Sequence, residues 1–187
     1  MTGLAERGMM AERIWHHFYD EGVPFEIEPP EEPLFIQLEK AALKFPQVIA
    51  TDFMGACLTY QQLAEQVNRF ASSLSAMGVE PGDRIAIMLP NCPQIIIAYY
   101  AALSIGAVVV MTNPMYVERE LAHQFADAGV KVLVGLDHLM PRIDKVWIET
   151  PVEQLIITSI RDYLPFPLNV LYPLKARKQK LNLRVPY

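Results

Sequence analysis

Histidine is the side chain that most often binds a metal ion or moves a proton near neutral pH, and it occurs four times in this chain of 187 residues. His16 and His17 are adjacent, so on a helix they would point in different directions, while His123 and His138 lie on separate predicted elements. Two ligands on one helix face need a spacing of three or four residues. We therefore predict that this chain holds no metal ion.

The carboxylates, hydroxyls and thiols predict no catalytic constellation either. Glu118 and Glu120 are two residues apart, a spacing at which helical side chains do not face each other, so a favourable charge at a helix N-terminus explains them. The serines within 72–75 lie in a helical pattern with no histidine nearby in sequence, as a triad would need. Cys57 and Cys92 lack the spacing of a zinc site or a disulfide framework and are predicted to be buried thiols.

The sequence lacks the glycine spacing of a nucleotide-binding loop. A phosphate site in an α/β domain usually has glycines between a strand and a helix, because backbone amides must approach the phosphate oxygens. The nine glycines of this chain are dispersed at predicted helix ends and turns. We therefore expect no cofactor to be bound by this chain alone, and we assign it no catalytic residue.

Composition sets the class of protein. The chain is 52% hydrophobic and 20% charged, which is typical of a globular domain, and its net charge of −5 argues against a nucleic-acid partner. Its N-terminus has scattered charges and does not resemble a secretory signal. The apolar run Ile95–Met111 is interrupted by Ser104 and Gly106 and is shorter than the roughly 20 residues of a membrane-spanning helix. These features predict a cytoplasmic protein.

Three parts are expected along the chain. Residues 1–33 should form a short helix and a linker rich in proline and glutamate. Residues 34–160 should form the α/β body. Residues 161–187 should form a proline-rich and then basic tail, in which the prolines break any long helix.

Hydrophobic periodicity predicts the elements of the body, with a small hairpin at 48–59. Thr59 and Gln62 have the spacing of a capping box, and Asn91 is the predicted cap of a helix that should be covered on all sides. Helices are predicted at 34–45, 60–77, 95–105 and 118–128, and strands at 84–89, 107–111, 130–134 and 155–158. Because strands and helices alternate, we predict a doubly wound, mostly parallel sheet with flanking helices, in which 107–111 is a central strand.

Several segments, in order and at characteristic distances, resemble a known family. Leu58–Leu63 is similar to the first core motif of the acyl-adenylate-forming enzymes, the AMP-dependent synthetase and ligase superfamily. The segments Asn68–Ala71 and Gly78–Pro93 continue that likeness, and Ala101–Pro114, followed by Arg119–Leu121, resembles the second core motif. The resemblance covers about two thirds of the chain.

Within that superfamily, Asn91–Pro93, Thr112–Tyr116 and Ile160–Pro167 look most like long-chain fatty acyl-CoA ligases. The resemblance implies that the parent enzyme makes an acyl-adenylate from a fatty acid and ATP with magnesium, and then transfers the acyl group to coenzyme A. The family's phosphate loop and catalytic lysine have no counterpart in this sequence. The expectation is therefore an N-terminal fragment of such a ligase that acts as scaffold and is inactive alone.

Two alternatives remain open at this point. One is a stand-alone α/β binding or interaction module that needs no ATP, and the other is a ligase for an aromatic or short-chain acid. An exposed apolar face would favour the fragment, and a sealed polar surface would favour the module. A homodimer is also left open.

The tail carries the candidate site of this chain. Its apolar and aromatic residues stand beside a basic run, a combination typical of peripheral contact with the inner face of a membrane. Packing against another part of the enzyme is the alternative explanation. The membrane-contact candidates are Phe166, Leu171, Tyr172, Lys175, Arg177, Lys178 and Lys180.

Overall fold

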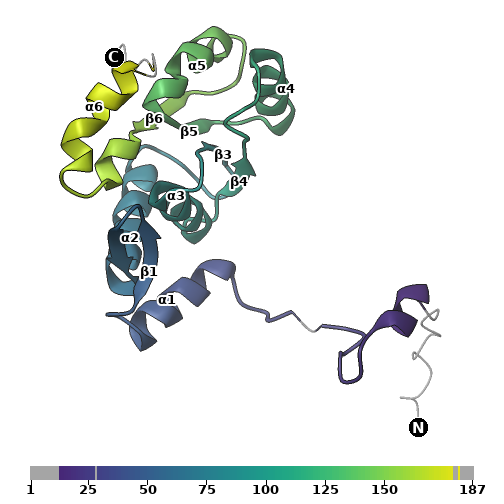
Figure 1. Cartoon of the computed structure of the whole chain (residues 1–187). Coiled ribbons are helices and arrows are strands. Elements are labelled where there is room, and N and C mark those ends of the chain that lie inside the picture. The colour runs from purple at the N-terminus through teal and green to yellow at the C-terminus, as the bar shows by residue number, and fades with distance from the viewer. Residues whose placement is uncertain (1–12, 28, 179–180, 182–187) are drawn as a thin grey trace. The chain divides into compact units, whose positions relative to one another are not determined.

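The computed structural model describes residues 13–27, 29–178 and 181, and it divides the chain into two units, Met1–Glu32 and Pro33–Tyr187 (Figure 1). In the first unit, the predicted N-terminal helix is, within the described residues, only the five-residue 3-10 helix η1 (Ile14–Phe18). None of its residues is buried, although the His16 ring stacks on Phe25 with the ring centroids 4.5 Å apart. The described residues of the linker are exposed, as their proline and glutamate content predicts.

The second unit is built on a parallel sheet, which confirms the predicted fold class. Antiparallel strands β1 (Ile49–Phe53) and β2 (Ala56–Thr59) form a separate hairpin. The parallel strands are β3 (Arg84–Met88), β4 (Val108–Met111), β5 (Val132–Leu136) and β6 (Gln154–Thr158). Their order across the sheet is β4-β3-β5-β6, so the two interior strands are β3 and β5.

Helices cover both faces of this sheet (Figure 1). One layer contains α1, α2 and α3, which pack on one another, and the other contains α4 and α5. The helices are α1 (Leu34–Lys44), α2 (Tyr60–Ala76), α3 (Pro93–Ser104), α4 (Glu118–Ala128), α5 (Met140–Trp147) and α6 (Leu168–Lys178), with the 3-10 helices η2 (Asp137–Leu139) and η3 (Ile160–Tyr163). This is the doubly wound arrangement that alternating strands and helices predict.

The prediction that 107–111 is a central strand was wrong. Helix α3 leads the chain to β4 on one side of β3, and α4 then returns it to β5 on the other side, so β4 lies at an edge. Val108 is 49% exposed and Met111 is 48% exposed. Within the described residues, this apolar strand therefore lacks the cover that its composition predicts.

The start of α2 confirms the predicted capping box. The Thr59 hydroxyl accepts a hydrogen bond from the Gln62 amide at 3.2 Å, and the Gln62 side chain accepts one from the Thr59 amide at 2.9 Å. Two amides that lack partners inside the helix are thereby satisfied. The helix buries a stripe formed by Leu63, Val67, Ala71 and Leu74.

Two details of α3 differ from the prediction. Cys92, and not Asn91, occupies the N-cap position, and it makes no side-chain cap. One side of the helix, which includes Tyr99 and Tyr100, is only partly buried, whereas cover on all sides was expected. An apolar sequence indicates that a helix needs cover, but it does not show whether every neighbour that would cover it belongs to the same chain.

Helix α4 ends where the sequence predicted. Gly129 has φ = 60°, in the left-handed region that glycine adopts without strain. A Cβ atom at this position would lie 2.7 Å from Nη2 of Arg84, whose Nε donates to the Ala128 carbonyl at 3.1 Å. Glycine is therefore required by the backbone and by the neighbouring guanidinium. The strand that follows begins at Val132 and not at residue 130, because residues 130–131 serve as the connection.

The tail, in which the prolines were expected to break any long helix, contains the 11-residue helix α6. Pro173 lies inside it and has no amide to bond the carbonyl four residues earlier, which belongs to Asn169. Nε of Arg161 donates to that carbonyl at 2.9 Å. A side chain from η3 thus supplies the hydrogen bond that the proline removes.

Asp83 organises the amino end of the sheet. Its carboxylate accepts from the Glu80 amide at 2.8 Å and from Nζ of Lys131 at 2.6 Å, and its carbonyl accepts from the Val108 amide at 2.8 Å. The hydrogen bond from Glu80 and the ion pair with Lys131 hold the pKa of Asp83 below its usual value. One residue thereby joins the segments that lead into β3, β4 and β5.

We expect Asp83→Asn to lower the free energy of unfolding at pH 7. Because the folded state depresses this pKa, the charged form contributes stability above the unfolded-state value of about 3.9 and loses it as the pH falls further. Urea unfolding from pH 7 to pH 3 should therefore show a difference between parent and variant that narrows below about pH 4. The matched control is Asp127→Asn, at an exposed position. A difference that stays constant across this range would contradict the assignment.

Candidate functional site

The carboxyl ends of the strands form the candidate site. In a doubly wound sheet, ligands bind where neighbouring connections leave toward opposite faces, and here that point lies between β3 and β5. The segments beyond these ends contain two of the buried polar side chains of the described residues, Gln94 and Asp137. Thr158 and Ser159, at the end of β6, lie within hydrogen-bonding distance of Gln94.

Gln94 connects the first turn of α3 to β6. Its side chain is only 7% exposed, and Nε2 donates to the Ser159 carbonyl at 2.9 Å and to the Thr158 hydroxyl at 3.3 Å. Its Oε1 is buried without a partner among the described residues. The amide therefore joins two segments that are 65 residues apart in sequence.

Asp137 is the buried acid of this region, and it is 6% exposed. Burial alone would raise its pKa, but hydrogen bonds from His138 and from the Ser159 side chain outweigh burial and lower it. The backbone amide of His138 donates to Oδ1 at 2.7 Å. A carboxylate whose oxygens are held in this way orders the loop after β5 and is a poor general base.

A small recess opens beside these residues. Its volume is about 140 Å³, and most of its lining is apolar. The phenol of Tyr163, whose pKa burial raises, donates to Oε1 of Gln66 and closes one side. The lining residues are Phe70, Gln94, Ile97, Ala98, Val134, Ile156, Thr158 and Tyr163. The recess can hold an apolar group, but its lining contains no nucleophile paired with a base.

The structure separates the other residues that could have formed a site. Among the residues that it describes, no group of three His, Cys, Asp or Glu side chains could hold a metal ion. Glu118 pairs with Lys145, with Oε1 and Nζ 2.8 Å apart, and this contact lowers the pKa of Glu118. Cys92 is buried, and burial raises its pKa, but Cys57 is exposed, so the prediction of two buried thiols was wrong for Cys57. The strand β2 turns Cys57 away from the core.

The membrane-contact candidates lie on and beside α6. Phe166 is 81% exposed, and Tyr172 is partly buried, with a pKa that burial raises. Lys180 lies outside the described residues. The remaining candidates, Leu171, Lys175, Arg177 and Lys178, are exposed.

Sequence reasoning missed Gln94, Asp137 and helix α5. Arg142 of α5 donates from Nη1 to the carbonyls of Pro114 at 2.7 Å and Tyr116 at 2.9 Å, and so holds the loop after β4. Polar residues directly after apolar runs were the available signal. The partners of these side chains are distant in sequence, so spacing alone could not find them.

We expect Gln94→Leu to lower the free energy of unfolding by about 1–3 kcal/mol, because the Ser159 carbonyl would lose its buried donor. Chemical denaturation followed by circular dichroism measures the change. The control is Gln61→Leu, at an exposed position in α2, which should change stability by less than about 0.5 kcal/mol. A Gln94→Leu protein as stable as its parent would show that the amide link contributes nothing.

Comparison with known proteins gives a consistent result. Residues 38–179 match the family model described as AMP-binding enzyme. The chain is 42% identical over 175 residues to a long-chain-fatty-acid–CoA ligase of Bacillus subtilis, and the alignment covers 94% of this chain and 31% of that protein. It is 36% identical over 155 residues to the ligase of the same name from Yersinia pestis, with 82% of this chain and 28% of that protein covered.

A solved structure extends the likeness to the fold. A long-chain-fatty-acid–CoA ligase of Archaeoglobus fulgidus superimposes with a TM-score of 0.68 at 25% identity, covering 78% of this chain and 32% of that one. The chain thus spans about a third of the length of the relatives that it matches. The family model covers more than half of the chain, and the motifs around Thr59 and after β4 lie within it. This chain belongs to the AMP-binding enzyme family.

Proposed function

We propose that this chain serves as the N-terminal scaffold of an AMP-forming ligase that joins long-chain fatty acids to coenzyme A. The observation that carries the proposal is the 42% identity to the Bacillus subtilis ligase across nearly the whole chain. Family membership implies use of ATP. Magnesium and coenzyme A are part of the proposal, and the residues that would hold them are not assigned in this chain.

An exposed apolar surface supports the role of scaffold. It lies along the edge strand β4 and the loop that follows it, where Met115 is 79% exposed and Val117 is 54% exposed, in addition to Val108 and Met111. A parallel sheet is stable when both faces and edges are covered, so such an edge suits a further part of the same enzyme. A stand-alone module would be expected to have a sealed polar surface there.

The parts of the chain are proposed to have different roles in the ligase. We propose that residues 34–160 form the first α/β subdomain of the ligase and that residues 161–187, whose helix α6 packs on it, form a tail that connects it to the rest of the ligase. The unit Met1–Glu32 is separate from this subdomain. The hydrogen bonds from Arg142 to the loop after β4 and from Gln94 to the end of β6 hold the loops at the carboxyl end of the sheet in place.

Fatty acids are favoured over aromatic and short-chain acids as substrates. The curated relatives at 42% and 36% identity are named long-chain-fatty-acid–CoA ligases. Among the solved ligases named for aromatic acids, an anthranilate CoA ligase shares the fold at 17% identity and a benzoate CoA ligase at 21%. At such low identity the likeness shows a shared fold and gives no information about the substrate of this chain.

A chimeric ligase tests this proposal. The aligned segment of the Bacillus subtilis ligase is replaced by this chain, and palmitate-dependent release of pyrophosphate and AMP is measured with ATP, magnesium and coenzyme A. We expect the chimera to be active with palmitate, because the shared fold should support the residues of the Bacillus subtilis ligase that follow the replaced segment. We expect the 187-residue chain alone to catalyse no acid-dependent exchange between ATP and pyrophosphate.

Two results would contradict the proposal. One is robust exchange by the 187-residue chain alone. The other is a folded chimera, shown by an unchanged circular dichroism spectrum, that activates benzoate or acetate but not palmitate.

A further inference from the structure

Helix α6, yellow in Figure 1, presents an apolar stripe to solvent. Val170 is 57% exposed, Leu171 is 48% exposed and Leu174 is 64% exposed. Residues three and four apart lie on the same side of a helix, so these three side chains form one patch. Phe166, which is 81% exposed, precedes the helix and adds aromatic surface near it.

The opposite side of α6 is fixed to the body of its unit. Ala176 is completely buried and Tyr172 is partly buried. Arg161 of η3 donates to the Asn169 carbonyl at 2.9 Å, and Tyr163 of the same 3-10 helix donates to Oε1 of Gln66 in α2, so α6 is joined to the body through η3. The helix therefore cannot bury its apolar stripe by turning over without breaking these contacts.

Basic side chains border the stripe. Lys175 and Lys178 lie four residues after Leu171 and Leu174, and Arg177 lies three after Leu174, all exposed. No acidic residue occurs from Leu168 to Lys178, although the chain as a whole has a net charge of −5. No ion pair joins these three cations to a carboxylate of the described residues.

We propose that this face of α6 binds the surface of an anionic lipid bilayer. Apolar side chains can enter the boundary between head groups and acyl chains, while the long basic side chains reach the lipid phosphates beside it. No helix in the described part of the chain is long and apolar enough to cross a bilayer, so the contact is peripheral. The proposal concerns a lipid surface and is independent of the ligase activity.

The charge pattern favours a membrane over a second copy of the chain. In a dimer that pairs this face with itself, each copy contributes Lys175, Arg177 and Lys178 and no carboxylate from α6, so the buried cations would have no opposite charge on the partner helix. An anionic lipid surface supplies the complementary charge over the whole face. The remaining alternative is that α6 packs against the rest of a longer ligase. Vesicle binding by the chimeric ligase distinguishes this alternative from a lipid contact, because a covered α6 would not bind vesicles.

Co-sedimentation of the 187-residue chain with vesicles tests the proposal. We compare phosphatidylcholine vesicles with vesicles that contain phosphatidylglycerol, at low and at high salt. We expect binding to the anionic vesicles only, with a marked loss at high salt because the attraction is screened. The double variant Lys175→Glu and Lys178→Glu should lower the partition coefficient by at least about tenfold.

The controls match charge and exposure. Lys44→Glu with Arg119→Glu makes the same change in net charge at exposed positions of α1 and α4 and should leave binding within about twofold of the parent. Leu174→Ser keeps the charge and should weaken binding because it removes apolar contact. Circular dichroism confirms that each variant is folded.

Three results would overturn the proposal. The first is no binding to anionic vesicles. The second is an equal loss of binding in the α6 and control double variants, which would indicate a general charge effect. The third is binding by the chain but none by the folded chimeric ligase, which would show that another part of the enzyme covers α6.

Discussion

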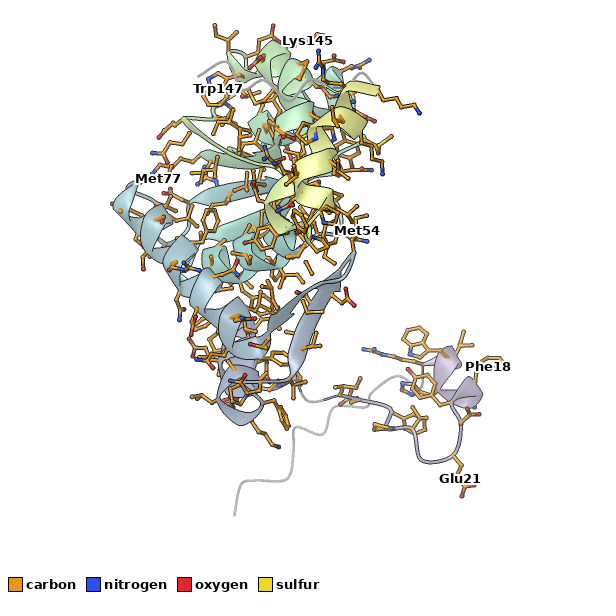
Figure 2. The ribbon with its side chains drawn as sticks, turned by 60° about the vertical axis from the view of Figure 1, so that its left-hand side comes forward. Phe18, Glu21, Met54, Met77, Lys145 and Trp147 are labelled. Carbon is orange, nitrogen blue, oxygen red and sulfur yellow. The ribbon has the colours of Figure 1, made fainter. Side chains whose placement is uncertain are left out.

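The fold depends on two neighbouring strands whose apolar side chains are buried on both faces of the sheet. Ile85, Ala86, Ile87 and Met88 of β3 are completely buried, and every residue of β5 is buried as well. Parallel strands of this kind require helices on both sides of the sheet. The chain meets this requirement by placing the α3 crossover on one face and the α4 and α5 crossovers on the other. Figure 2 shows the side chains that fill the resulting layers.

Both ends of this buried pair are fastened by polar contacts. At the amino end, Asp83 bonds to Glu80 and Lys131, and at the carboxyl end, Gln94 bonds to Ser159. Such contacts contribute less to stability than the apolar core does, but each sets the position of a loop. These contacts hold the loops at both ends of the sheet in place, which suits the scaffold role that we propose.

Local signals predicted much of this fold, and long-range partners account for what they missed. The capping box at Thr59 and the end of α4 at Gly129 depend on neighbours within a few residues, so sequence spacing was sufficient. Strand order depends on which side of β3 the α3 crossover takes, and an apolar run such as 107–111 has the same composition at an edge or in the centre. A helix that includes Pro173 was not predicted, because the hydrogen bond that replaces the missing one comes from Arg161, twelve residues earlier. The link from Gln94 to Ser159 was missed for the same reason.

This chain completes the core around β3 and β5 by itself, and we propose that it leaves β4 for the rest of the ligase to cover. Amide hydrogen exchange, compared between the 187-residue chain and the chimeric ligase, tests this division most directly. We predict slow exchange in β3 and β5 in both proteins, and slow exchange in the amides of β4 that face away from β3 only in the ligase. Equal protection of those β4 amides in the two proteins would contradict it.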